Sequence, residues 1–145
     1  MRLKVRKSHI DAVTPSKAHN DDAGYDLATI ESYCLKPSET KLFRTGLHLQ
    51  LEKDKNDFNL YGLFIKERSG LGKKGIGVRG GTCDEPYAGE YMVLLTNHGD
   101  KAYQVVKGDR IAQLVIQRVE SIPVDEVEEL DSTERGSKGF GSSGR

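Results

Sequence analysis

The feature that most constrains the fold is a series of short apolar-alternating or β-rich runs separated by clusters of turn-forming residues. Six runs are expected to form strands: Leu3–Arg6, Lys41–Leu51, Phe58–Lys66, Tyr91–Thr96, Ala102–Val106 and Arg110–Val119. Four turn clusters are Asp21–Gly24, Glu52–Asp57, Gly70–Gly81 and Asn97–Asp100. No window longer than about ten residues carries a capped 3.6-residue apolar stripe, so we expect at most one or two helical turns. This pattern predicts an all-β fold and favours a barrel or a jelly roll.

Size and charge restrict the class of partner. The chain has 145 residues, enough for one domain with a core, and its 22 basic residues balance 22 acidic ones. We therefore expect no nucleic-acid partner, since no global field attracts an extended polyanion. We also expect no membrane partner, because no apolar run approaches about 18 residues. We expect a cytoplasmic location, or a host cytoplasm or nucleus for a viral source, because two unclustered cysteines suit a reducing compartment. Cys34 and Cys83 lack metal-ligand spacing and are expected to be small buried hydrophobes.

The composition changes near Asp125, where the chain becomes acidic and then rich in glycine. We therefore divide it into a body, residues 1–124, and a C-terminal arm, residues 125–145. The end of the arm, Arg135–Gly144, cannot bury a core and by itself predicts a flexible tail. Its parts nevertheless suit a nucleotide, because arginine, serine hydroxyls and glycine backbone bind phosphate and Phe140 offers a flat surface to a base.

Two clusters in the body carry groups that suit phosphate. Asp26 follows Gly24 at the mouth of a strand, where it would hold a water of a hydrated Mg²⁺ or, alternatively, bond its own backbone. Arg68, Ser69 and the N–H of Gly70 follow an apolar strand and would converge on a phosphate, although an ordinary basic turn is the alternative. The spacing of a P-loop is missing.

Two further segments carry polar groups in a β context. The segment Gly81–Glu90 predicts a hairpin, in which Asp84 would either deprotonate a water or serve as a structural turn residue. Tyr87 would present its ring to a sugar. Gln113 lies in an apolar run expected to bury Ile111, so its amide must either bond backbone or face a polar site.

Taken together and in this order, these segments resemble the five motifs of the trimeric deoxyuridine triphosphatases (dUTPases). The matching segments are Ala23–Leu27, Arg68–Gly72, Gly81–Glu90, Gly108–Gln113 and Arg135–Gly144. The resemblance implies a small jelly-roll-like β-barrel assembled as a homotrimer, with three active sites between subunits, each closed by the arm of one chain. It also implies hydrolysis of dUTP to dUMP and pyrophosphate, which keeps uracil out of DNA and supplies dUMP for thymidylate synthesis.

The resemblance also implies a role for each matching residue. Asp84 would activate the water that attacks the α-phosphorus, Asp26 would hold a water of Mg²⁺, and Tyr87 would pack under the deoxyribose. Phe140 would stack on the base. The phosphate chain would be held by four residues of the body: Arg68, Ser69, Gly70 and Gln113. The uracil edge would be read by hairpin backbone around Thr82, Cys83 and Met92. The terminal phosphates would be clamped by Arg135, Gly141, Ser142 and Ser143.

The chain departs from the family pattern in three places. Thr82 and Cys83 replace two aliphatic residues of the hairpin motif, and Lys138 stands where glycine is usual. The link Gly70–Cys83 is shorter than is common and lacks the usual asparagine, with Arg79-Gly80-Gly81 in its region. If the Thr82 and Cys83 side chains point into the body, the backbone readout of uracil survives the substitution.

Three other readings fit part of the sequence. The dCTP deaminases share the serine loop and the hairpin aspartate, but their catalytic glutamate falls where this chain has Leu94. A non-catalytic nucleotide sensor would need the binding residues without the base. A jelly-roll structural or capsid protein would explain the strands and leave the arm unexplained.

Overall fold

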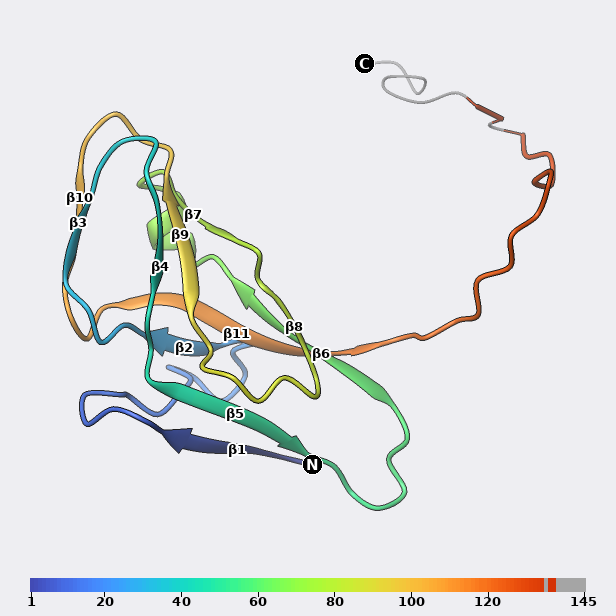
Figure 1. Cartoon of the computed structure of the whole chain (residues 1–145), viewed down its shortest axis with the longest axis horizontal. Helices are drawn as coiled ribbons and strands as arrows, with labels where there is room; N and C mark the ends of the chain where they lie inside the picture. Colours follow the sequence, from blue (N-terminus) through green and yellow to red (C-terminus); the bar gives the residue numbers. More distant parts are fainter. Residues whose placement is uncertain (135, 138–145) are drawn as a thin grey trace.

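The computed structural model describes residues 1–134, 136 and 137. Within them the chain forms β1 (Arg2–Lys7), β2 (Tyr25–Ala28), β3 (Tyr33–Leu35), β4 (Thr40–Phe43), β5 (Leu47–Glu52), β6 (Leu60–Lys66), α1 (Ser69–Gly72), β7 (Ile76–Arg79), β8 (Thr82–Asp84), β9 (Val93–Asn97), β10 (Tyr103–Val105) and β11 (Arg110–Val119). Figure 1 shows these strands wrapped around a common interior. The all-β prediction is confirmed, and in the described part α1 is the single helical turn.

The strands form four antiparallel sheets around one core. A four-stranded sheet has the order β2-β11-β6-β8, and a three-stranded sheet has the order β4-β9-β7. Two ribbons, β1-β5 and β3-β10, complete the body. Fully buried side chains from different sheets meet in one apolar cluster, which includes Leu27, Phe43, Leu63, Leu95 and Val105. Burial of this cluster fixes the four sheets relative to one another.

The local pattern located most strands but missed their breaks. The run Lys41–Leu51 was expected to be one strand, and it is two, because Gly46 adopts a left-handed φ of 69° between β4 and β5. The cluster Gly70–Gly81, read as a turn, contains most of α1 and all of β7. The strand Arg110–Val119 has the expected bounds.

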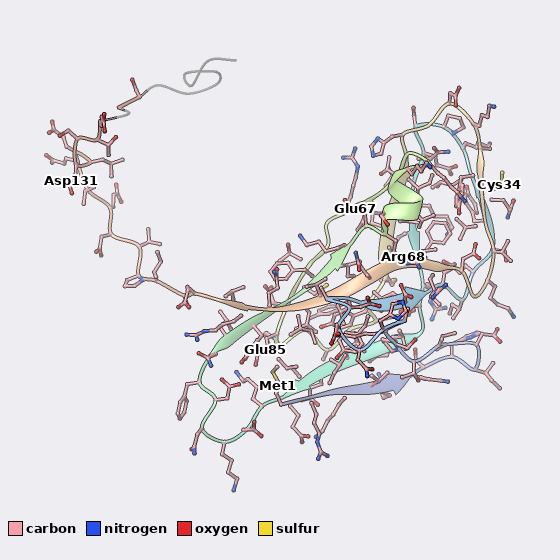
Figure 2. All side chains as sticks on the ribbon, turned by 180° about the vertical axis from the view of Figure 1, so that it is seen from behind. Met1, Cys34, Glu67, Arg68, Glu85 and Asp131 are labelled. Atoms are coloured by element: carbon pink, nitrogen blue, oxygen red, sulfur yellow. The ribbon has the colours of Figure 1, made fainter. Side chains whose placement is uncertain are left out.

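The two cysteines occupy different environments. Cys83 is half-buried and packs against the core, and burial followed by the negative charge of Asp84 raises the pKa of its thiol. Cys34 is exposed on β3, opposite Gln104 of β10 (Figure 2). The expectation that both cysteines are buried hydrophobes is therefore wrong for Cys34, because its side chain lies on the outer face of a two-stranded ribbon.

The chain leaves the sheet at the end of β11 (Figure 1). Residues 120–134 contain no strand, and four of their apolar side chains are exposed: Ile122, Val124, Val127 and Leu130. The arm residues expected at the site lie outside the described part of the chain, namely Arg135, Phe140, Gly141, Ser142 and Ser143, as does Lys138. Among the described residues, no helix is long and apolar enough to cross a bilayer.

Candidate active site

Three of the motifs, Ala23–Leu27, Arg68–Gly72 and Gly108–Gln113, meet at one end of the four-stranded sheet. Asp26 on β2 lies opposite Gln113 on β11, which in turn lies opposite Lys66 at the end of β6. The loop Arg68–Gly70 follows directly and begins α1 (Figure 2). A cavity of about 300 Å³ opens between them and is lined by Ala18, Asp22, Ala23, Gly24, Asp26, Arg68, Ser69, Gly70 and Gln113. We call this cavity the phosphate pocket.

Asp26 is held between two arginines at the phosphate pocket. Its Oδ1 lies 2.8 Å from Nε of Arg68, and its Oδ2 lies 3.0 Å from Nη1 of Arg110. Arg68 also donates from Nη1 to the carbonyl of Arg110 at 3.0 Å. The charges of Arg68 and Arg110 balance those of Asp22 and Asp26, so it is the arginine N–H donors not bonded to Asp26 that suit an anion here. Sequence reasoning had not assigned Arg110, although it lies within the Gly108–Gln113 motif.

Gln113 combines the two roles that the sequence left open. Its Nε2 donates to the carbonyl of Glu67 at 2.8 Å, and the half-buried side chain also lines the phosphate pocket. Its neighbours Ala112 and Leu114 are fully buried, so Gln113 faces the site while they face the core. Gly24 lies directly against this side chain, because a Cβ at Gly24 would be only 2.5 Å from Oε1 and 3.0 Å from Cβ of Gln113.

We expect the substitution Gly24→Ala to lower activity more than stability. The added Cβ would displace the end of the Gln113 side chain, which can rotate away, and the phosphate pocket would lose its amide. The Cβ of Gln113, 3.0 Å away, would need only a small shift. We expect kcat/KM to fall about 10-fold with Tm changed by less than about 3 °C, since no backbone atom is overlapped. Steady-state kinetics and calorimetry on the same preparation check this. Unchanged kcat/KM would show that Gln113 does not act at the site.

The hairpin motif forms a second, separate cavity. Strand β8 pairs with β6, and a cavity of about 200 Å³ beside it is lined by Leu42, Thr82, Cys83, Tyr87, Glu90, Tyr91 and Met92. The Tyr87 ring packs edge-on against buried Tyr91, and its hydroxyl donates to the carbonyl of Glu90 at 3.1 Å. Cys83 points inward and Thr82 outward, so only one of the two substituted side chains enters the body. We call this cavity the hairpin pocket.

Asp84 ends β8 opposite Gly62 and is exposed. Within residues 1–134, 136 and 137, no hydrogen bond or ion pair engages its carboxylate. The neighbouring Glu85 differs, because it accepts a hydrogen bond from the N–H of Tyr61 at 3.0 Å and pairs with Lys53 at 2.7 Å. Of the two adjacent carboxylates, Glu85 is thus held by partners of the body, whereas Asp84 has none among the described residues.

Glu90 anchors the far side of the hairpin, a role that the sequence analysis did not anticipate. Its Oε1 accepts from the N–H of Gly46 at 2.7 Å, and its Oε2 accepts two bonds from Arg44 at 3.1 Å. Burial by itself would raise the pKa of Glu90, but these hydrogen bonds and the Arg44 charge together hold it below its ordinary value. The hairpin is thus tied to the turn between β4 and β5.

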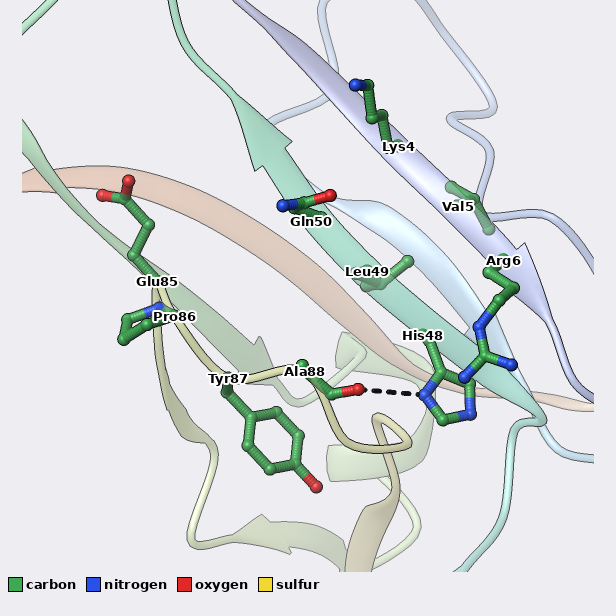
Figure 3. A pocket seen from close by; sticks show the side chains of 10 residues that line it. All are labelled: Lys4, Val5, Arg6, His48, Leu49, Gln50, Glu85, Pro86, Tyr87 and Ala88. Atoms are coloured by element: carbon green, nitrogen blue, oxygen red, sulfur yellow. Dashed lines mark hydrogen bonds between the residues drawn. The ribbon is translucent and has the colours of Figure 1, made fainter.

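A third cavity, of about 420 Å³, lies on the other side of the hairpin loop (Figure 3). Its lining comes from β1, β5 and the loop: Lys4, Val5, Arg6, His48, Leu49, Gln50, Glu85, Pro86, Tyr87 and Ala88. Nδ1 of His48 lies 3.1 Å from the carbonyl of Ala88 and closes one side. Of the residues in this lining, the sequence analysis assigned Tyr87 alone to the site. This cavity therefore lies along the outer side of the hairpin loop, away from the other predicted site residues.

The phosphate pocket and Asp84 are far apart within one chain. Asp26 and Asp84 lie on the two outer strands of the four-stranded sheet, and their partners on β6, Lys66 and Gly62, are four residues apart. With strands about 4.8 Å apart and about 3.3 Å per residue, the separation is about 20 Å. A base acts only within hydrogen-bond reach or through one water. Within one chain, Asp84 therefore lies beyond direct reach of a phosphate held beside Asp26.

Comparison with known proteins agrees with the motifs and the geometry. The dUTPase family model matches residues 10–144. A deoxyuridine 5′-triphosphate nucleotidohydrolase of Nautilia profundicola is 44% identical over the full length of both chains, and one of cowpox virus is 42% identical over 92% of this chain and 86% of its own. A solved dUTPase of Staphylococcus bacteriophage 80alpha with dUpNHpp is 29% identical, covers 99% of both chains and has a TM-score of 0.87. The chain therefore belongs to the dUTPase family and hydrolyses dUTP to dUMP and pyrophosphate.

Proposed function

We propose that the reaction occurs between subunits, with the phosphate pocket of one copy facing the hairpin pocket of another. The observation that carries this proposal is the separation of about 20 Å between Asp26 and Asp84 within one chain. A second copy brings an Asp84 to the phosphate that Arg68 holds. The proposed assembly is a homotrimer, and the exposed apolar side chains of residues 120–134 favour packing against another copy.

In the proposed mechanism, Asp84 accepts a proton from a water that attacks the α-phosphorus of dUTP. The bond from the α-phosphorus to the bridging oxygen of the β-phosphate breaks, dUMP retains the new oxygen, and pyrophosphate leaves. Arg68, Ser69 and the N–H of Gly70 hold the phosphate chain together with Gln113, because residues with guanidinium, hydroxyl, amide and backbone donors all line one pocket.

The hairpin pocket accounts for selection of the nucleoside. Backbone groups around Thr82, Cys83 and Met92 would pair with the uracil edge, so cytosine would present donors where acceptors are required. A 5-methyl group would meet the hairpin and exclude thymine. The Tyr87 ring, fixed by its bond to Glu90, would pack under the deoxyribose where a 2′-hydroxyl does not fit.

Magnesium is proposed to arrive with the substrate. Among the described residues, no group of three or more carboxylate, histidine or cysteine side chains could hold a metal ion. Both oxygens of Asp26 already accept from arginine, yet a carboxylate has about four acceptor sites, so Asp26 can still bond a metal-bound water. When bound to the triphosphate, Mg²⁺ would offset its negative charge. Asp26 would orient that hydrated ion.

Release of pyrophosphate from a panel of nucleotides tests the activity and its selectivity. With Mg²⁺ present, we expect turnover of dUTP and at least about 100-fold lower kcat/KM for dCTP, dTTP and UTP, because each would leave a mispaired or crowded group. Tight binding of dUTP without pyrophosphate release would instead favour the nucleotide-sensor reading. Equal turnover of UTP would contradict the role of Tyr87.

We also propose that the chain divides into a body, residues 1–124, and an arm, residues 125–145, that closes over a neighbour's site. The proposed location of the protein is the cytoplasm, or the host cytoplasm or nucleus for a viral source. Phe140 would stack on the base, and Arg135, Gly141, Ser142 and Ser143 would clamp the terminal phosphates. Ten extended residues span about 33 Å, enough to cross a subunit face. If the arm becomes ordered when substrate binds, it would exclude from the site all water molecules except the one that attacks.

Deletion of Arg135–Arg145 is expected to leave the assembly intact and to remove most activity. The truncated residues lie beyond all eleven strands of the described body, so its fold and Tm should persist. Size-exclusion chromatography with light scattering would report the assembly, and kcat/KM for dUTP would report the arm. Full activity of the truncated chain would contradict the proposed closure.

A further inference from the structure

The position of Arg110 results from an irregularity in β11. Ala112 pairs with Leu27, but the next pair is Arg110 with Ala28, so Ile111 is an extra residue in the strand. Residues three apart in a regular strand face opposite sides, and Arg110 would then face away from Gln113. The bulge reverses this, because Ile111 and Ala112 are both fully buried and Arg110 emerges on the face of the phosphate pocket.

The pairing places Arg110 beside Asp26. Ala28 and Asp26 are two residues apart on β2 and share a face, so Arg110, opposite Ala28, lies on that face as well. Its Nη1 bonds Oδ2 of Asp26 at 3.0 Å, while Oδ1 bonds Nε of Arg68 at 2.8 Å. The Asp26 side chain is 16% exposed and that of Arg110 is 56% exposed. Asp26 is thus fixed from one side by an arginine whose own head group remains in solvent.

We propose that Arg110 is a positioning residue for dUTP hydrolysis, acting through Asp26 to hold the Arg68 guanidinium toward the phosphate pocket. This inference rests on the proposed function of the pocket. Without Arg110, Asp26 keeps Arg68 as its one arginine partner, and its Oδ2 loses the positive charge beside it. The carboxylate can then rotate and draw Arg68 away from phosphate. The bond from Arg68 to the backbone carbonyl of residue 110 survives any substitution there, so only the link through Asp26 is lost.

The variants Arg110→Gln and Arg110→Lys test the inference. We expect Arg110→Gln to lower kcat/KM for dUTP by about 10- to 100-fold, because a charge-assisted hydrogen bond is lost. Arg110→Lys should keep most of the wild-type kcat/KM, because lysine can still supply the single donor and the positive charge that Asp26 receives from Arg110. Tm should change by less than about 2 °C in both, because the ion pair is largely exposed on the Arg110 side. The matched control is Arg118→Gln, which removes an exposed arginine of the same strand whose ion pair, among the described residues, is with Glu120.

A double-mutant cycle separates action through Asp26 from direct contact with phosphate. In an Asp26→Asn background, Arg110→Gln should lower kcat/KM by less than about 2-fold further, since the link is already broken. The same loss in both backgrounds would overturn the inference, as would a wild-type kcat/KM for Arg110→Gln. Binding of α,β-imido-dUTP, measured by calorimetry, should weaken in Arg110→Gln in parallel. Wild-type protein that fails to hydrolyse dUTP would refute the proposed function instead.

Discussion

The substitution Asp84→Asn is expected to lower kcat for dUTP by about 10²- to 10⁴-fold while leaving KM within about 3-fold. A general base contributes a factor of this size, and asparagine cannot accept a proton from water. Because Asp84 is exposed at the end of β8 and its carboxylate has no partner among residues 1–134, 136 and 137, the substitution breaks no internal contact. Steady-state pyrophosphate release and thermal unfolding of the same sample check both parts.

The neighbouring carboxylate supplies the control for this prediction. Glu85→Gln removes one negative charge next to Asp84, but Glu85 bonds the N–H of Tyr61 and pairs with Lys53. It should therefore lower Tm by a few degrees and keep kcat within about 3-fold. If Asp84→Asn retained more than about a tenth of wild-type kcat, Asp84 would be a structural turn residue and another group would be the base.

The substitution Gly81→Ala is expected to be the most damaging small change in the hairpin. A Cβ at this position would overlap the carbonyl oxygen of Ile65, a backbone atom of the central strand β6 that cannot move aside. At the same place, the N–H of Ile65 donates a hydrogen bond to the carbonyl of Gly81 at 2.6 Å, which holds the two strands together. Relieving the overlap must displace β8, and with it Asp84, at a cost of about 3 kcal/mol.

Two measurements follow from this displacement. Tm should fall by roughly 5–10 °C, and kcat/KM should fall by at least about 10-fold because the hairpin leaves its register. Gly72→Ala is the matched control, since a Cβ there meets no atom within 4 Å, and it should leave both quantities near wild type. A Gly81→Ala protein as stable and active as the control would show that β6 and β8 tolerate a wider spacing.

The extent to which the sequence predicted the fold depends on the element. The strand Arg110–Val119 was predicted with its exact bounds, because ten residues of apolar alternation are a strong local signal. Strand β7 was not predicted, since it lies in the glycine-rich segment Gly70–Gly81, and β3 was missed because its three residues are too few for a clear alternation. The break at Gly46 was also missed, because alternation continues on both sides of it.

The candidate site divides in the same way. The motifs located Asp26, Arg68 and Gln113, and the antiparallel register brings them to one pocket. Tyr91 and Glu90, which support the hairpin, were not anticipated, because their roles depend on packing against Tyr87 and on a bond to the distant Gly46. Such contacts join segments that no local pattern relates.

The sequence by itself determined the β-rich class, the hairpin with its aspartate and the residues that can bind phosphate, because short-range alternation and side-chain chemistry are properties of local sequence. Only the tertiary structure decided which of these residues meet. The bulge at Ile111 turns Arg110 toward Asp26, and the order β2-β11-β6-β8 holds Asp84 about 20 Å from Asp26. Register and strand order arise from pairing between distant segments, and burial of a shared core selects them.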